Sequence, residues 1–242
     1  MLPFNIIQKY KLKPKKDVYG MELRLNIIKY VCDKYDIKLN NMIDLGGNSG
    51  FFSMSLIKNM YATHSIIIDM DNDIIKYGLK IRNEMNLYDE IFFENKIINL
   101  ESIRMLNIVD TIICMNVLHH AGVIFDQYIV EQISWKKYII LFLDILFSKC
   151  KIIILCLNFF QNRMMFENNY YITPDIFLKI LLENNIDFLY HGNIQYAKQY
   201  GIDKLNTFNI SKINHFLKFY NSYNNDNILN NYYMYIIKRK KK

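Results

Sequence analysis

The sequence predicts an α/β protein built on a doubly wound, mostly parallel sheet. Three observations carry this prediction. Short apolar runs alternate along the chain with longer stretches of helical periodicity. The runs are apolar at nearly every position, as strands buried on both faces of a parallel sheet are. A glycine-rich turn, "DLGGNSG", follows the first run and precedes a helical pattern, an arrangement in which such sheets bind ligands.

Seven segments have the composition of buried strands, and helical patterns lie between them. The expected strands are Asn41–Leu45, His64–Met70, Glu90–Ile97, Val109–Asn116, Cys150–Leu157, Asp187–Gly192 and Tyr232–Lys240. The expected helices are Met21–Tyr35, Gly50–Met60, Asn72–Met85, Tyr128–Ser148 and Thr173–Asn185. The last of these begins with Thr-Pro-Asp, in which threonine is a good N-cap and proline suits the first turn.

The alternation of strands and helices breaks down at two places. Residues 1–40 are expected to form an N-terminal helical arm, followed by the sheet domain of residues 41–242. Residues 193–231 are partly helical in pattern around Ser211–Tyr220 and then rich in asparagine. We interpret them as an insertion before the last strand that contributes to a substrate pocket.

The composition excludes several classes of protein. Hydrophobic residues make up 52% of the 242 residues, which excludes a disordered or fibrous chain. The most apolar stretch, Tyr138–Leu157, is interrupted by three charged residues, so no membrane span is expected. The N-terminus lacks the apolar core of a signal peptide. The four cysteines have no metal-ligand spacing and are expected to be buried thiols in a reducing, cytoplasmic compartment; they are Cys32, Cys114, Cys150 and Cys156.

The formal net charge of +7 favours anionic partners. Lysine, asparagine and isoleucine are abundant throughout the chain, however, so a general compositional bias explains much of this charge. The lysine clusters at residues 9–16 and 238–242 are interpreted as solvated ends.

The glycine-rich turn is the most informative motif, and three chemistries can use a strand, a glycine turn and a helix. A phosphate-binding P-loop requires a lysine after its last glycine, and none is present. A dinucleotide-binding turn has a third glycine that is missing here. A carboxylate at Asp44 would also repel a pyrophosphate. An acidic residue beside the turn suits a ligand that carries positive charge.

The third chemistry explains Asp44. The stretch "DLGGNSG" resembles motif I of the class I S-adenosylmethionine-dependent methyltransferases, whose cofactor carries an ammonium and a sulfonium. The resemblance implies a Rossmann-like seven-stranded sheet and cofactor contacts from Asp44, Gly46, Gly47, Asn48 and Gly50. Asn48 replaces the usual middle glycine, and asparagine tolerates the left-handed backbone better than most residues.

Further segments extend the resemblance over roughly residues 42–192. Asp69 and Met70 end the second strand, where an acidic side chain in this family binds the ribose hydroxyls. Asn99 stands where the family often has a carboxylate that contacts the adenine amino group. The stretch "DTIICMNVLHH" resembles motif IV of the small-molecule members, which places Asn116 among the cofactor-binding residues.

His119 and His120 follow the fourth strand, at the edge where open α/β sheets bind ligands. Methyl transfer to a hydroxyl needs a base, and a histidine near neutral pKa can serve. One of an adjacent pair is expected to point into the structure. Arg24, with Tyr19, is interpreted either as an ordinary helix-surface arginine, the favoured reading, or as part of a lid that binds the cofactor's carboxylate.

The sequence therefore predicts a cytoplasmic enzyme that transfers a methyl group from S-adenosyl-L-methionine to a small or medium-sized acceptor. We expect O-methylation of a sugar, a glycan precursor or another anionic metabolite. One alternative is an RNA methyltransferase that grips phosphates with its basic ends. The other is a non-catalytic binding subunit that keeps the methyltransferase fold.

Overall fold

The computed structural model describes residues 18–158, 166–167, 170–171, 173–194, 197, 202 and 232–240. Most of the expected insertion, with its helix at Ser211–Tyr220, lies outside the described residues. The side chain of Tyr19 and the lysine cluster at residues 9–16 also lie outside them. Every helix in the described part is too short or too polar to span a bilayer.

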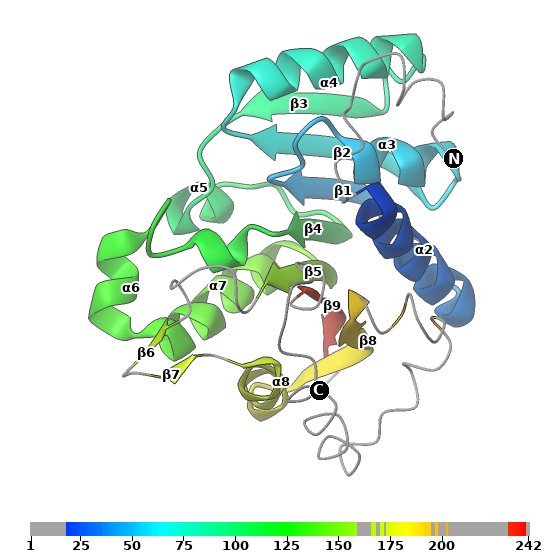
Figure 1. Cartoon of the computed structure of the whole chain (residues 1–242). Coiled ribbons are helices and arrows are strands. Elements are labelled where there is room, and N and C mark those ends of the chain that lie inside the picture. The colour runs from blue at the N-terminus through cyan, green and yellow to red at the C-terminus, as the bar shows by residue number, and fades with distance from the viewer. Residues whose placement is uncertain are drawn as a thin grey trace.

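Seven strands form one sheet with the order β3-β2-β1-β4-β5-β9-β8 (Figure 1). The first five strands of the chain run parallel, whereas β9 is antiparallel to both of its neighbours. The strands are β1 (Asn40–Leu45), β2 (Ala62–Asp69), β3 (Ile91–Asn95), β4 (Thr111–Met115), β5 (Ile152–Asn158), β8 (Ile186–Asn193) and β9 (Tyr232–Arg239). The prediction of a doubly wound seven-stranded sheet is confirmed.

The helices follow the predicted pattern with two corrections. They are α2 (Val18–Tyr35), α3 (Phe51–Lys58), α4 (Asn72–Glu84), α5 (Leu100–Arg104), α6 (Gln127–Ile133), α7 (Trp135–Lys149) and α8 (Pro174–Glu183), with a 3₁₀ turn η1 (Leu118–His120). The single helix expected over Tyr128–Ser148 is wrong, because Ser134 adopts φ 72° and ψ 156° and separates α6 from α7. The five-residue α5 and the short ribbon of β6 (Phe166–Glu167) and β7 (Tyr170–Tyr171) were not expected.

Helices α2, α3 and α4 cover one face of the sheet. Successive residues of a strand point to opposite faces, so Met42 of β1 packs on this side and Ile43 on the other. On α2, Ile27 and Ile28 are fully buried in the same cluster as Ile154 of β5. This packing fixes α2 beside the sheet and determines where its polar residues lie.

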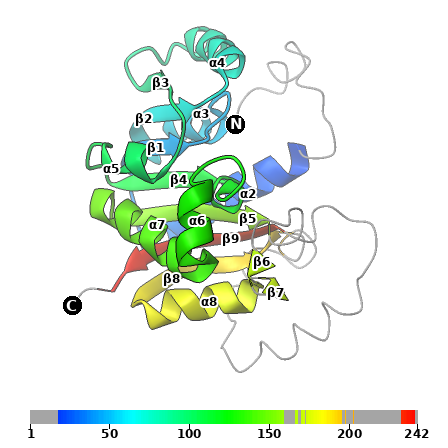
Figure 2. The same ribbon diagram turned by 90° about the vertical axis from the view of Figure 1, so that its left-hand side faces the viewer.

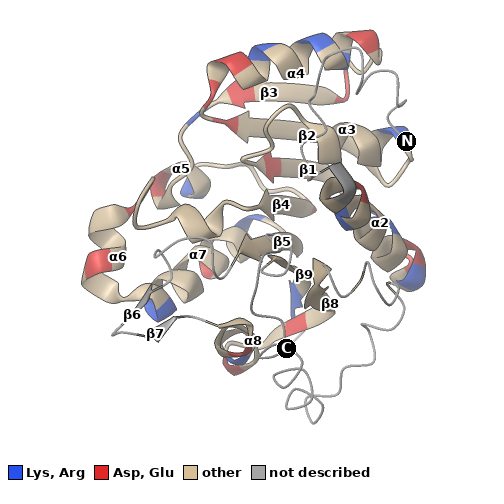
Figure 3. Ribbon diagram, viewed as in Figure 1, with Lys and Arg blue, Asp and Glu red and all other residues tan. Residues whose placement is uncertain are grey.

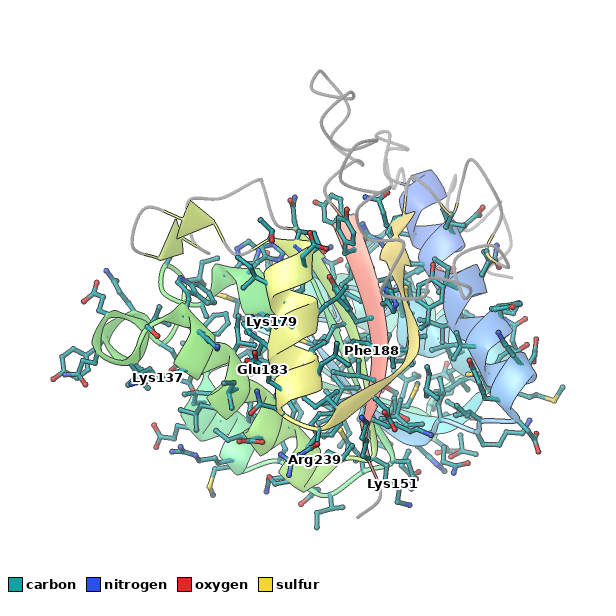
Figure 4. The ribbon with its side chains drawn as sticks, turned by 90° about the horizontal axis from the view of Figure 1, so that it is seen from below. Lys137, Lys151, Lys179, Glu183, Phe188 and Arg239 are labelled. Carbon is teal, nitrogen blue, oxygen red and sulfur yellow. The ribbon has the colours of Figure 1, made fainter. Side chains whose placement is uncertain are left out.

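The opposite face is covered by α5, α7 and α8 (Figure 2). Phe142 of α7 and Phe177 of α8 are fully buried against it. Seen from below, α8 lies beside β9 and β8, with Lys179 and Glu183 labelled along it (Figure 4). The Nζ of Lys179 lies 3.9 Å from a carboxylate oxygen of Glu183, an exposed pair that contributes little stability.

The carboxyl ends of the parallel strands meet at one edge of the sheet, as the doubly wound topology requires. The loops after β1, β2 and β4 therefore lie close together. Because β9 is antiparallel, its first residue also lies at this edge: Tyr232 pairs with Asn158, the last residue of β5. The last strand thus begins where the loops of the candidate site meet.

Candidate active site

The turn after β1 holds three residues in the left-handed backbone region. The φ angle is 65° at Gly46, 51° at Asn48 and 86° at Gly50. Glycine adopts this region freely, and asparagine is enriched there among the other residues. The left-handed asparagine expected from the sequence is present. Space is also restricted, since a Cβ on Gly47 would lie 2.7 Å from Cγ of Asp44.

Replacement of Gly50 by alanine is expected to lower the free energy of unfolding by about 2 kcal/mol. The φ of 86° strains an L side chain, and the new Cβ would lie 2.6 Å from Cδ1 of Ile67. Urea unfolding measures the change. The control is Asn48→Gly in the same turn, for which a change within about 0.5 kcal/mol is expected. Equal stability of Gly50→Ala and the wild type would contradict this backbone conformation.

Asp69, the last residue of β2, anchors the turn from the neighbouring strand. Its Oδ2 accepts a hydrogen bond from the backbone N–H of Asn48 at 2.9 Å, and its Oδ1 accepts one from that of Asp71 at 3.0 Å. A carboxylate offers about four acceptor sites, so acceptor capacity remains. Asp69 lines a cavity at this edge of the sheet, where its remaining acceptor sites suit a pair of hydroxyl donors. The predicted ribose contact remains a prediction.

Asp44 lies near the end of β1 and is buried, with 1% of its surface exposed. Its Oδ2 accepts a hydrogen bond from the Ser53 hydroxyl at 2.8 Å, and the Ser65 hydroxyl donates in turn to Ser53 at 2.9 Å. Its Oδ1 is buried and has no hydrogen-bond partner among the described residues. Burial raises the pKa of Asp44 from 3.8 to about 7, partly offset by the Ser53 hydrogen bond. Oδ1 of Asp44 can therefore accept a hydrogen bond from a ligand donor or pair with a ligand's positive charge.

The raised pKa of Asp44 predicts a pH-dependent stability. An aspartate titrates near 3.8 when unfolded and near 7 in this fold, so the unfolded chain loses its proton first as the pH rises. The stabilisation is complete below pH 4 and is lost progressively up to about pH 7. A shift of this size corresponds to a change in unfolding free energy on the order of 4 kcal/mol. Asp44→Asn is expected to remove this dependence.

The measurement is the difference in unfolding free energy between the wild type and Asp44→Asn from pH 4 to pH 8. The difference matters because two histidines act in the opposite direction. Burial lowers the pKa of both His119 and His120, so their contribution falls as the pH drops below about 6.5. Both proteins contain these histidines, so the contribution of the histidines cancels in the difference. A pH-independent difference would contradict a buried, protonated Asp44.

Arg24 corrects the favoured sequence interpretation. Arg24 does not lie on the exposed surface of α2. Only 2% of the residue is exposed, and it lines the same cavity as Asp69. Its Nε and Nη2 are buried without a hydrogen-bond partner among the described residues. Its guanidinium carbon lies 4.7 Å from the centre of the Tyr232 ring. A fixed positive charge therefore stands at the cavity with unused donors.

A cavity of about 450 Å³ brings these side chains together. Eight residues predicted from the sequence line it: Asp44, Gly46, Gly47, Asn48, Asp69, Met70, Asn116 and His120. The sequence did not indicate several others, which are Met21, Ser49, Phe51, Phe52, Ile97, Ile98, Met115, Val117, Ile124 and Phe125. Acidic segments lie toward the ends of β1 and β2 in Figure 3, at the same edge of the sheet.

Three predicted site residues do not line the cavity, namely Gly50, Asn99 and His119. Gly50 shapes the turn and begins α3. Asn99 is the N-cap of α5: its Oδ1 accepts from the backbone N–H of Ser102 at 2.7 Å, and the Ser102 hydroxyl accepts from the N–H of Asn99 at 2.9 Å. The side-chain oxygen is therefore committed to the helix end. The structure gives Asn99 a capping role, and the predicted adenine contact stays a prediction.

His119 and His120 have different surroundings. His119 is buried, with 4% exposed, and does not line the cavity, whereas His120 does. Their ring centres are 4.2 Å apart. Burial, then the charges of His120 and Arg24, lowers the pKa of His119 to about 3, and burial lowers that of His120. The lowered pKa values leave both rings neutral at pH 7, and of the two only His120 lines the cavity.

Asp126 holds the loop that closes this part of the cavity. Its Oδ2 accepts hydrogen bonds from the backbone N–H of Leu100 at 2.9 Å and from the Tyr138 hydroxyl at 2.7 Å. These contacts join the start of α5, the start of α6 and α7. Ile124 and Phe125, immediately before Asp126, are thereby placed along the cavity wall.

No protein-family model matches the sequence, and no curated protein sequence matches it. Solved structures do resemble it. The magnesium protoporphyrin IX methyltransferase of Synechocystis PCC 6803, crystallised with S-adenosylmethionine, is 14% identical over 92% of this chain and 81% of its own, with a TM-score of 0.57. An S-adenosylmethionine-dependent methyltransferase of Clostridium acetobutylicum ATCC 824 is 9% identical over 98% of each chain, with a TM-score of 0.57.

The N-methyltransferase NodS of Bradyrhizobium japonicum WM9 is 9% identical over 92% of this chain and 97% of its own, with a TM-score of 0.54. Identities this low establish a common fold and leave the acceptor open. The strand order and the antiparallel β9 agree with that fold. The chain has the Rossmann-like fold of the class I S-adenosylmethionine-dependent methyltransferases.

Proposed function

We propose that the chain is a methyltransferase that binds S-adenosyl-L-methionine in the cavity at the strand ends. The observation that carries this proposal is the pair of buried, unsatisfied groups on one cavity, Oδ1 of Asp44 and the guanidinium of Arg24. A buried polar group without a partner is unfavourable, and a buried charge without one is strongly so. The ammonium and carboxylate of the cofactor's methionine portion supply the two missing partners.

The remaining lining accommodates the rest of the cofactor. Gly46 and Gly47 let the backbone approach it closely, and Asp69 retains acceptors for the ribose hydroxyls. Met70 and Ile97 are 58% exposed and border the same cavity, which provides an apolar surface for the adenine ring. An ammonium beside Asp44 favours its ionised form, so binding is expected to release a proton near neutral pH.

We propose that the acceptor is a hydroxyl and that His120 removes its proton. The bound cofactor supplies an electrophilic methyl group, which leaves its sulfur as the acceptor oxygen bonds to it. His120 accepts the hydroxyl proton as that bond forms, since its ring is neutral and faces the cavity. Residues 1–40 and the insertion at 193–231, most of which lies outside the described residues, are proposed to complete the acceptor pocket. A sugar, glycan precursor or other anionic metabolite in the cytoplasm remains the proposed substrate.

Methyl transfer from labelled S-adenosylmethionine tests this proposal against a panel of hydroxyl, amine and carboxylate acceptors and against RNA. We expect S-adenosylhomocysteine to form with a hydroxyl acceptor, whose mass rises by one methylene. Turnover restricted to amines would contradict O-methylation, and turnover restricted to RNA would contradict a small-molecule acceptor. Cofactor binding without turnover on any acceptor would support a non-catalytic subunit and overturn the enzyme proposal.

A further inference from the structure

We propose that Tyr232 is a positioning residue that holds the guanidinium of Arg24 in place to bind the cofactor's carboxylate. This inference rests on the proposed function. It assigns a role in cofactor binding to the first residue of β9, a strand that comes almost at the end of the chain and far from the glycine turn in sequence.

Such a partner stabilises Arg24 because the side chain is buried and two of its donors are unsatisfied among the described residues. The side chain is 2% exposed, so water does not solvate its charge. Its Nε and Nη2 have no hydrogen-bond partner among the described residues. The Tyr232 ring lies 4.7 Å from its guanidinium carbon, within the distance at which a ring face attracts a cation.

The sheet holds the backbone of Tyr232 in place. It pairs with Asn158 of β5, and the next residue, Tyr233, pairs with Asn193 of β8. Its ring packs against the same apolar cluster that contains Ile27 and Ile28 of α2. The ring and the helix that carries Arg24 are thus fixed to each other through the core.

The burial of Arg24 strengthens its contact with the Tyr232 ring. A cation–π contact is stronger when it is desolvated than when it is exposed to water. A planar guanidinium stacked on a ring keeps its N–H edge free for a carboxylate, which it binds in a bidentate manner. The contact therefore orders Arg24 before the ligand arrives, and the ligand does not have to immobilise it.

Two variants separate this role from simple packing. Tyr232→Phe keeps the ring face, and we expect wild-type affinity for S-adenosylhomocysteine, within about twofold. Tyr232→Leu removes the ring face, and we expect the dissociation constant to rise about 10- to 30-fold. Calorimetric titration measures both. The ligand 5′-methylthioadenosine, which lacks the amino-acid portion, is expected to bind all three proteins equally.

A double-mutant cycle with Arg24→Met completes the test. If Tyr232 acts through Arg24, then Tyr232→Leu has little further effect once Arg24 is replaced. Additive losses, or an equal loss of 5′-methylthioadenosine affinity in Tyr232→Leu, would overturn the positioning role. Failure of the wild type to bind S-adenosylhomocysteine would instead overturn the proposed function, so the two failures are distinguishable.

Discussion

Arg24→Met is expected to weaken the binding of S-adenosylhomocysteine by about 100- to 1,000-fold, the result of leaving one charge of a buried pair without its partner. The carboxylate of the ligand would then lie at the buried position of residue 24 without a cation to pair with. Arg24 is the buried guanidinium on the cavity wall. Methionine retains much of the aliphatic volume, so the fold of α2 is expected to survive.

The matched control for this variant is Arg82→Met. Arg82 is also a helical arginine beside a tyrosine, with its guanidinium carbon 5.6 Å from the Tyr88 ring centre, and it does not line the cavity. We expect the affinity of Arg82→Met for S-adenosylhomocysteine to stay within about twofold of the wild-type value. Calorimetry on the wild type and both variants measures the effect. Equal weakening by the two substitutions would show that loss of positive charge alone is responsible.

His120→Gln is expected to lower kcat by about 100- to 10,000-fold, as removal of a general base does. Glutamine occupies similar space but does not accept the proton. The affinity for the cofactor should change little, because His120 is assigned to the acceptor. In the wild type, activity should persist below pH 6.5 before it falls, since burial lowers the pKa of His120 and the base stays neutral there.

The adjacent histidine provides the control for this prediction. His119 is buried and lies away from the cavity, so His119→Gln should affect stability more than kcat. Steady-state kinetics with the acceptor found in the panel measure both variants. A large loss of kcat in His119→Gln with none in His120→Gln would reverse the assignment.

The sheet was predictable because each strand is a short apolar run bounded by polar residues, a signal that does not depend on distant contacts. The boundary between α6 and α7 was not, because Ser134 adopts a φ of 72° without being a glycine, so the sequence carries no glycine or proline signal there. Helix α5 has only five residues, too few to establish a period.

The candidate site was predictable where backbone chemistry determines it. Glycines and asparagine mark the left-handed turn, and Asp44 and Asp69 follow from the strand ends. Arg24 was misjudged, although the sequence contained a signal: Ile27, Ile28 and Val31 stand three, four and seven positions later and share its face of the helix. All three are buried. The role of Asn99 could not be read from its position, because a cap and a ligand contact use the same residue type.

The central claim is that Asp44 and Arg24 form a site for the amino-acid portion of the cofactor. Calorimetric titration of the wild type with S-adenosylhomocysteine and with 5′-methylthioadenosine, beside Asp69→Ala, tests it most directly. We expect S-adenosylhomocysteine to bind at least about 100-fold more tightly than 5′-methylthioadenosine, and Asp69→Ala to weaken both. Equal affinities for the two ligands, or no binding of either by the folded wild-type protein, would contradict the claim.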